Sequence, residues 1–248
     1  PRSTLFPYTT LFRSAFHFYM PPQCAGLADL ETTRVDLNLL RSIESVSSPQ
    51  SAVLDKVESA LPFFAHAAAD DAAVSMSTEL VMMVAAYEHL LEPKALKLSE
   101  CLADLLKPFG SGKTVEDARR KGRPIYRDPD EKHALKLNAA PVHRGWIYEL
   151  HKRRSAAIHP GKSVLNQWGW TQFEHLVIAG FLFPLIVKIL LERERRYTLT
   201  DVDIGHLRAI DPLLIERDWL SPEEGGGWAK TVKRAEVRED VRRRLEAT

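Results

Sequence analysis

The chain has 248 residues, of which 45% are hydrophobic and 27% are charged, and its formal net charge is +1. This length and apolar content support one large domain, or an ordinary domain with an appendage, and near-neutrality means that any nucleic-acid site must be a local basic patch. Two distant cysteines, Cys24 and Cys101, exclude a disulfide framework and a cysteine zinc site, and they fit a reducing cytoplasm.

The first segment, Pro1–Ser14 (PRSTLFPYTTLFRS), follows no single helical or strand period and has no export signal. Its back-translation reproduces a common short-read sequencing adapter. We therefore expect residues 1–14 to be adapter carried into an assembled fragment. Residues 15–50 are then expected to be the remnant of a truncated N-terminal region, with a further domain missing before it.

Helical periodicity dominates the rest of the chain, and strand signals are almost absent. Apolar residues recur on one face of residues 51–69, where Pro62 is expected to kink or split the helix. A second helix is predicted over Ser77–Leu91, with Ser77 as its N-cap. A third is predicted over about Ala95–Leu106.

A polar stretch, Gly110–Lys132, is rich in Gly, Pro and charged residues. It predicts a long loop or insertion with a short helix at Val115–Arg120. Its GSGKT sequence differs from a phosphate-binding P-loop, because Lys107 stands where the pattern needs Gly and because a helix precedes it. We expect a flexible turn there.

Another helix is predicted over Val142–Ile158. The most apolar helix follows, over about Thr171–Arg196, with a kink expected at Pro184. Its core, Leu176–Leu191, is shorter than the roughly 20 apolar residues that cross a bilayer and contains Lys188, so a buried core helix is predicted.

The C-terminal part contains a capping-box pattern at Thr200–Asp203, which opens a short helix toward Ala209. After a glycine hinge, a charged terminal helix carries a narrow apolar stripe of Val237, Val241 and Leu245. The elements together predict an all-α, antiparallel up-and-down helical bundle over residues 51–221, with a polar insertion. Residues 222–248 are the predicted hinge and C-terminal helical extension.

The segment Ile147–Lys162 (IYELHKRRSAAIHPGK) carries the strongest candidate site. On a helix, Arg154 lies on the same apolar side as Ile158. A buried guanidinium is costly unless it is paired, and Glu88, in an otherwise apolar helix, is the candidate partner. His159 follows Arg154 by five residues, where the helix should end.

An Arg, four residues and a His at the end of a bundle helix resemble the RxxxxH signature of HEPN domains. With ELVMMVAAYEHLLEP upstream, the chain looks most like the Apea-like branch, over roughly Leu61–Leu191. The resemblance implies a helical bundle that forms a homodimer and, in many members, a metal-independent endoribonuclease without a cofactor. It implies His159 as general base or acid, Arg154 as the phosphate clamp and Glu88 as the residue that orients Arg154.

Three features of the sequence depart from the family pattern. Arg153 also fits the motif, so the motif arginine stays open between Arg153 and Arg154, with Arg154 preferred for its apolar side. Ser155 stands where Asn, Asp or His is common, and Pro160 follows the histidine where Gly is usual.

A local basic patch for RNA is expected from Lys152, Arg153 and Lys162. Trp168 and Trp170 are expected in the core or an interface in preference to base stacking.

The sequence therefore supports two functions. The first is a cytoplasmic HEPN ribonuclease of a defence or toxin–antitoxin system, acting on RNA as a homodimer with no metal and no membrane. The second is a catalytically inactive HEPN bundle that serves as a sensor, dimerisation or nucleotide-binding module.

Overall fold

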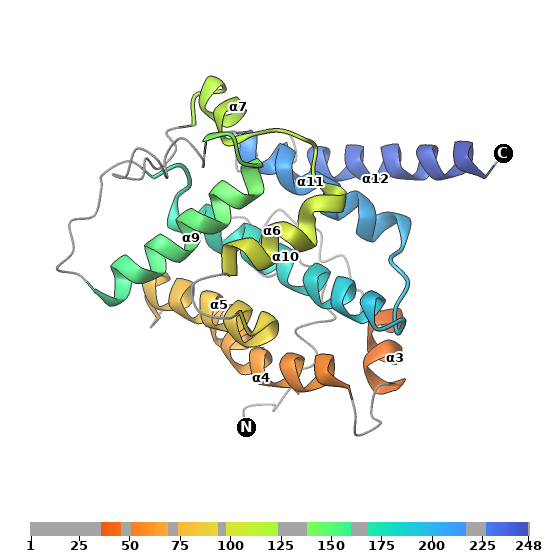
Figure 1. Ribbon diagram of the computed structural model, residues 1–248, viewed down its shortest axis with the longest axis horizontal. Helices are drawn as coiled ribbons and strands as arrows, with labels where there is room; N and C mark the ends of the chain where they lie inside the picture. Colours follow the sequence, from red (N-terminus) through yellow and green to blue (C-terminus); the bar gives the residue numbers. More distant parts are fainter. Residues whose placement is uncertain are drawn as a thin grey trace, which may run out of the picture. The chain divides into compact units, whose positions relative to one another are not determined.

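The computed structural model describes residues 36–45, 51–68, 74–93, 98–123, 138–159, 168–216 and 227–247, without the side chains of residues 45 and 227–230. Within these ranges the chain has nine α-helices, one short 3-10 helix and no strand beyond an isolated bridge between Thr114 and Pro141. The predicted all-α packing of helices is confirmed (Figure 1). The predicted adapter segment and most of residues 15–50 lie outside the described ranges.

The helices fall into two compact units, residues 1–93 with 172–198, and residues 94–171 with 199–248. The domain bounds inferred from the sequence stay predictions. The first unit contains the following helices in chain order: α3 (Leu37–Ser45), α4 (Ala52–Ala67), α5 (Met76–Leu91) and α10 (Gln172–Arg193). In this unit α4 and α5 lie side by side, and α10 packs on both (Figure 1).

Aromatic side chains join these three helices in the core of the first unit. The rings of Phe64 and Phe183 stack with centroids 4.2 Å apart, and Tyr87 meets Phe183 edge-on at 5.5 Å. The Tyr87 hydroxyl donates a hydrogen bond of 2.7 Å to the carbonyl of Ala179, so that its one polar group is satisfied inside the core.

Helix α10 is long and apolar enough to cross a membrane by length and composition, and it is the one such helix in the described part of the chain. Within the protein, 83% of its most apolar window is buried, as expected for a core helix. The helix is continuous through Pro184. Lys188 keeps its charge paired, since its Nζ lies 2.6 Å from the Asp36 carboxylate.

The second unit contains the following elements: α6 (Leu98–Leu106), the 3-10 helix η2 (Lys107–Phe109), α7 (Val115–Arg120), α9 (Val142–Ile158), α11 (Asp201–Ile215) and α12 (Gly227–Glu246). Helix α9 is its centre and packs against α6, α7 and α11. Helix α12 lies along α11 (Figure 1). The fold thus places the motif helix, α9, among three neighbours.

Several predicted boundaries are confirmed, including both ends of α7 and of α9 and the capping box at Thr200–Asp203. The predicted N-cap of α5 is wrong by two residues, because Ser75 accepts the Thr78 N–H at 3.2 Å while the Ser77 hydroxyl accepts from Gln172.

The prolines do not interrupt their helices. Helix α4 runs through Pro62, and α11 runs through Pro212 to Ile215, beyond the predicted end at Ala209. Packing of the surrounding helical faces outweighs the one hydrogen bond that each proline removes.

Candidate functional site

Helix α9 carries four of the predicted site residues: Lys152, Arg153, Arg154 and, at its end, His159. Lys162 lies outside the described residues. Glu88 lies on α5, in the first unit, and is half-buried. Its pairing with Arg154, which belongs to the second unit, stays a prediction.

His159 is the C-cap of α9 and is exposed to solvent. Its backbone N–H donates to the Ser155 carbonyl at 3.0 Å, which closes the last turn of the helix. An imidazole at this position can exchange protons with bulk water or with a bound molecule. The Ser155 hydroxyl itself donates to the His151 carbonyl at 3.0 Å, so it is committed to the helix backbone.

Arg154 is half-buried, and its Nε is shielded from solvent. The predicted apolar side of α9 is confirmed near its middle, where Ile147 and Leu150 are fully buried. It is wrong at the C-terminal end, where Ile158 is 42% exposed. The side of the helix that carries Arg154 therefore leaves the core between Leu150 and Ile158.

Arg153 is held by contacts with three residues of the second unit, one of them on α9 itself. Its guanidinium carbon lies 4.4 Å from the centroid of the Trp168 ring, and its Nε lies 3.5 Å from a carboxylate oxygen of Glu149. Its Nη2 donates to the Trp170 carbonyl. Only 12% of the Arg153 side chain is exposed. These contacts give Arg153 a structural role.

Glu149 is the buried acidic residue of this network. Its carboxylate accepts the backbone N–H groups of Gly169, at 2.8 Å, and of Trp170, at 3.0 Å, and it is fully buried. These N–H groups belong to the turn just before α10, and a charged acceptor satisfies both. Sequence reasoning missed this role, although Glu149 and Arg153 have the i, i+4 spacing of a helical ion pair.

Arg123 holds the same turn from the end of α7. Its guanidinium donates to the carbonyls of Gly169, at 3.4 Å, and of Glu216, and it lies over the Trp170 ring at 5.9 Å. Trp170 is 1% exposed, and its indole N–H donates to the Leu214 carbonyl at 3.1 Å. Trp170 is therefore a core residue, as predicted.

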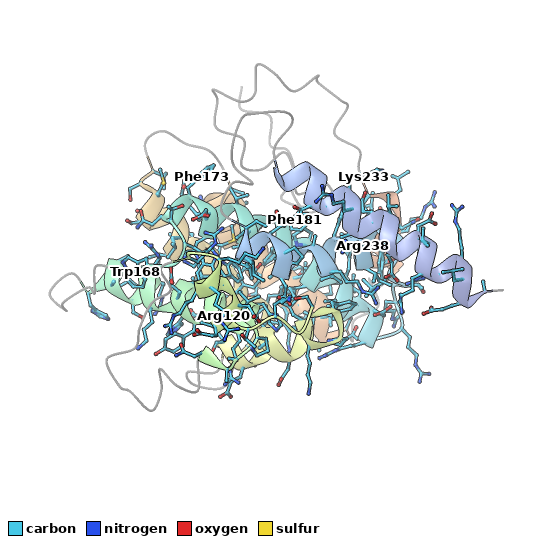
Figure 2. The ribbon with its side chains drawn as sticks, turned by 90° about the horizontal axis from the view of Figure 1, so that it is seen from above. Arg120, Trp168, Phe173, Phe181, Lys233 and Arg238 are labelled. Atoms are coloured by element: carbon cyan, nitrogen blue, oxygen red, sulfur yellow. The ribbon has the colours of Figure 1, made fainter. Side chains whose placement is uncertain are left out.

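Two other predicted residues have local partners. Lys152 is half-buried, and its Nζ lies 5.2 Å from the centroid of the Tyr148 ring on the previous turn of α9. Trp168 is half-buried beneath the Arg153 guanidinium (Trp168 is labelled in Figure 2). Each member of the predicted basic patch on α9 thus lies against an aromatic ring.

A second buried polar cluster holds the GSGKT turn. His143 and Asp211 are each 3% exposed, and the His143 Nδ1 lies 2.8 Å from an Asp211 oxygen. The other Asp211 oxygen accepts both the N–H of Ser111, at 2.7 Å, and its hydroxyl, at 2.9 Å. The serine thus bonds the carboxylate and not the imidazole, which is the wrong order for a serine nucleophile with a histidine base. We assign this cluster to anchoring the turn.

In the described residues, no group of three or more His, Cys, Asp or Glu side chains is arranged to hold a metal ion. No protein-family model, curated protein or solved structure matches the chain.

Proposed function

We propose that the chain is a HEPN-type, metal-independent endoribonuclease, with Arg154 and His159 as its catalytic pair. The proposal includes the finer fold expected from the motif: an up-and-down bundle over residues 51–221 with a polar insertion and a C-terminal extension. It also includes a cytoplasmic homodimer that acts on RNA in a defence or toxin–antitoxin system. The observation that carries it is the exposed His159 at the end of α9, five residues after a half-buried Arg154.

The chemistry needs a proton acceptor and a fixed positive charge. The 2′-OH of a ribose attacks the adjacent phosphorus, a 2′,3′-cyclic phosphate forms, and the 5′-oxygen of the next nucleotide leaves with a proton. A histidine can take the 2′-OH proton or supply the leaving-group proton near neutral pH. An arginine stays charged and offers planar donors to the non-bridging phosphate oxygens.

The choice of Arg154 over Arg153 rests on the contacts that hold Arg153 and on the position of Arg154 along α9. Arg153 lies between Trp168, Glu149 and the Trp170 carbonyl, so a phosphate would have to displace these contacts. Arg154 is closer in sequence to His159 and lies on the side of α9 that turns toward solvent at its end. Glu88 is the proposed residue that orients Arg154.

The proposal is tested with the purified full chain, a labelled RNA of mixed sequence and an excess of chelator. We expect cleavage that leaves 2′,3′-cyclic phosphate ends and that persists in chelator. The variants His159→Ala and Arg154→Ala should each lose about 10²-fold or more in rate, because each removes a group that acts in the transition state.

The matched control is His66→Ala, which removes an exposed histidine from the last turn of α4. This variant should cleave like the unmodified chain. Equal cleavage by His159→Ala and His66→Ala would show that the catalytic assignment is wrong. Cleavage that chelator abolishes would show that the metal-independent mechanism is wrong.

One observation favours the alternative, an inactive HEPN bundle that serves as a sensor, dimerisation or nucleotide-binding module. Ser155, which stands where the family's nucleases commonly carry Asn, Asp or His, has its hydroxyl bonded to its own helix. It offers the site no further acid, base or amide. If the full chain binds RNA or a nucleotide but cleaves nothing, this alternative replaces the first proposal.

A further inference from the structure

Helix α12 exposes an apolar stripe that no other part of the described chain covers. Val237 is 51% exposed, Val241 is 50% exposed and Leu245 is 73% exposed. Their spacing of four residues places them along one side of the helix. Exposed apolar side chains in a contiguous row, with charged residues beside them, are typical of interaction sites.

The stripe is not the side of α12 that packs on the rest of the second unit. That packing uses the opposite side, where Glu236 lies 2.5 Å from the His206 Nε2 and Glu239 pairs with Arg208. Gly205 of α11 comes so close that an added Cβ would lie 2.6 Å from the Glu236 Cα. These contacts fix α12 on α11 without the stripe, which no described residue outside α12 needs for packing.

Basic residues border the stripe on both sides. Arg238 and Arg244 stand three residues before and after Val241, and Arg234 stands three residues before Val237. Arg234 and Arg238 are exposed, and 78% of the Arg244 side chain is exposed. Figure 2 labels Arg238, together with Lys233, on this helix.

The acidic residues of α12 mostly lie elsewhere. Only 20% of the Glu236 side chain and none of the Glu239 side chain is exposed, because both face α11. Asp240 stands three residues after Val237 with 46% of its side chain exposed, and it pairs with Arg244 at 2.8 Å. Glu246 is exposed and pairs with Arg242 at 3.0 Å. The row of Val237, Val241 and Leu245 with its bordering arginines, here called the α12 ridge, therefore has a net positive charge.

We propose that the α12 ridge docks into an apolar groove bordered by carboxylates on a protein partner. An amphipathic helix with anchors one turn apart is a common ligand for such grooves, and the arginines would pair with the groove's border. A second copy of this chain would bring an equally basic ridge against the first, which like charges disfavour. The stripe has two valines, one leucine and no aromatic residue, which is a poor anchor for a lipid surface.

The test uses the full chain and calcium-loaded calmodulin, an acidic protein whose calcium-bound form exposes a Met-lined apolar groove. Binding is measured by calorimetry, with and without a calcium chelator. We expect saturable binding that the chelator abolishes, because the groove closes. Val241→Asp should weaken binding by roughly tenfold or more, since it removes an anchor and adds a like charge to the groove's border.

The matched control is Val202→Asp, because Val202 is also 50% exposed but lies in the first turn of α11. It should bind like the unmodified chain. A second variant, Arg238→Glu, tests the border alone and should weaken binding by roughly threefold or more without touching the stripe. Circular dichroism melts show whether each variant is folded.

The proposal fails if the full chain shows no saturable binding, or if Val241→Asp and Val202→Asp bind alike. It also fails if light scattering shows a dimer that Val241→Asp dissociates, because the occupant is then a second copy. Binding of the unmodified chain, but not of Val241→Asp, to vesicles of phosphatidylcholine and phosphatidylserine in equal parts would assign the ridge to a lipid surface instead. None of these outcomes depends on ribonuclease activity.

Discussion

At the scale of single residues, Glu149 shows how one buried carboxylate fixes the backbone beside the proposed active helix. It satisfies two N–H groups of the turn at Gly169 and Trp170 and lies 3.5 Å from the Arg153 Nε. A buried charge of this kind is costly if any partner is removed. The turn and the end of α9 should therefore depend on each other.

Replacing Glu149 tests this dependence. Glu149→Gln should lower the free energy of unfolding by roughly 2–4 kcal/mol, because a neutral amide is a weaker acceptor and leaves the Arg153 charge uncompensated. Urea denaturation measures it. The control, Glu100→Gln, removes an exposed partner 4.0 Å from Arg144, and it should cost less than about 0.5 kcal/mol. Equal losses for the two variants would contradict the assigned role of Glu149.

Arg153 and Arg154 should respond to alanine in different assays. Arg153→Ala removes the stack on Trp168 and leaves the buried Glu149 carboxylate without the arginine that compensates its charge. We therefore expect the free energy of unfolding to fall by about 2–3 kcal/mol. Arg154→Ala should lower RNA cleavage far more than stability. Denaturation and cleavage measured on both variants separate the roles, and a stable, inactive Arg153→Ala would reverse the assignment.

Part of this site was predictable from the sequence, and part was not. The helix that carries Arg154 and His159 was predicted with both ends correct, since its apolar period and the Pro160-Gly161 stop are local signals. The Glu149 network was not predicted, because its partners are backbone groups about twenty residues later in the chain. Backbone acceptors and donors leave no residue-type signal of their own.

At the scale of elements, the pair α11 and α12 depends on the absence of a side chain at Gly205. Helix α12 passes so close that a Cβ there would lie 2.6 Å from the Glu236 Cα and 2.8 Å from its N. Backbone atoms cannot move aside as a flexible side chain can. The glycine therefore sets the distance between the two helix axes.

Gly205→Ala should push α12 away from α11. We expect the free energy of unfolding to fall by roughly 1–3 kcal/mol, and amide exchange along α12 to rise, because the contacts of Glu236 and Glu239 with α11 are broken. Gly180→Ala in α10 is the matched control, since, apart from its chain neighbours and the backbone of its own helix, no atom lies within 4 Å of its added Cβ. It should stabilise the chain by about 0.5–1 kcal/mol, as alanine does in a helix interior. A stabilising Gly205→Ala would contradict the close approach.

Element boundaries also show where local signals are sufficient. The capping box of α11 was predicted, because Thr200 and Asp203, three residues apart, satisfy each other's groups, whereas the same arrangement of Thr114 and Asp117 in α7 was missed. The cap of α5 was not predicted correctly, because Ser75 and Ser77 are equivalent in sequence and only tertiary packing turns Ser77 toward Gln172. A split of α4 at Pro62 was wrong, since helix packing tolerates one missing hydrogen bond, while the expected kinks at Pro62 and Pro184 stay predictions.

At the scale of the whole molecule, low pH should weaken the ion pairs that hold α12 on α11 in the second unit. The pKa of Glu236 is lowered mainly by the hydrogen bond between this carboxylate and His206. For Glu239, burial raises the pKa, but three neighbouring arginines together lower it by more. A carboxyl with a lowered pKa in the folded state adds stability above its unfolded pKa, and that stability is lost as the pH falls through the folded value.

Acid should therefore release α12 before the first unit unfolds. The stability that Glu236 and Glu239 provide declines as the pH falls below their ordinary pKa of 4.5. At the lowered pKa of the folded state they take up protons and lose their pairs with His206 and the arginines. Amide exchange of residues 231–246, followed from neutral pH to about pH 3, should rise first along α12. In Glu236→Gln this rise should depend less steeply on pH. Simultaneous exchange of α12 and α4 would contradict a local acid response.

Alkali should act on the first unit through Tyr87. Complete burial raises the pKa of its phenol well above 10.0, so the folded state keeps the proton that the unfolded chain loses. The stability that this provides is full below pH 10 and is lost as the pH rises toward the folded value, by about 1.4 kcal/mol per pH unit.

Tyr87→Phe should cost about 1 kcal/mol at neutral pH, because the hydrogen bond to the Ala179 carbonyl is lost, but this variant should not lose stability in alkali through position 87. Urea denaturation of both chains from neutral pH to about pH 11 should therefore show the difference between them shrink and then change sign, while Tyr148→Phe, at a half-buried position, should track the unmodified chain. A difference that stays constant over this range would mean that the Tyr87 phenol ionises in the folded protein as it does in the unfolded chain.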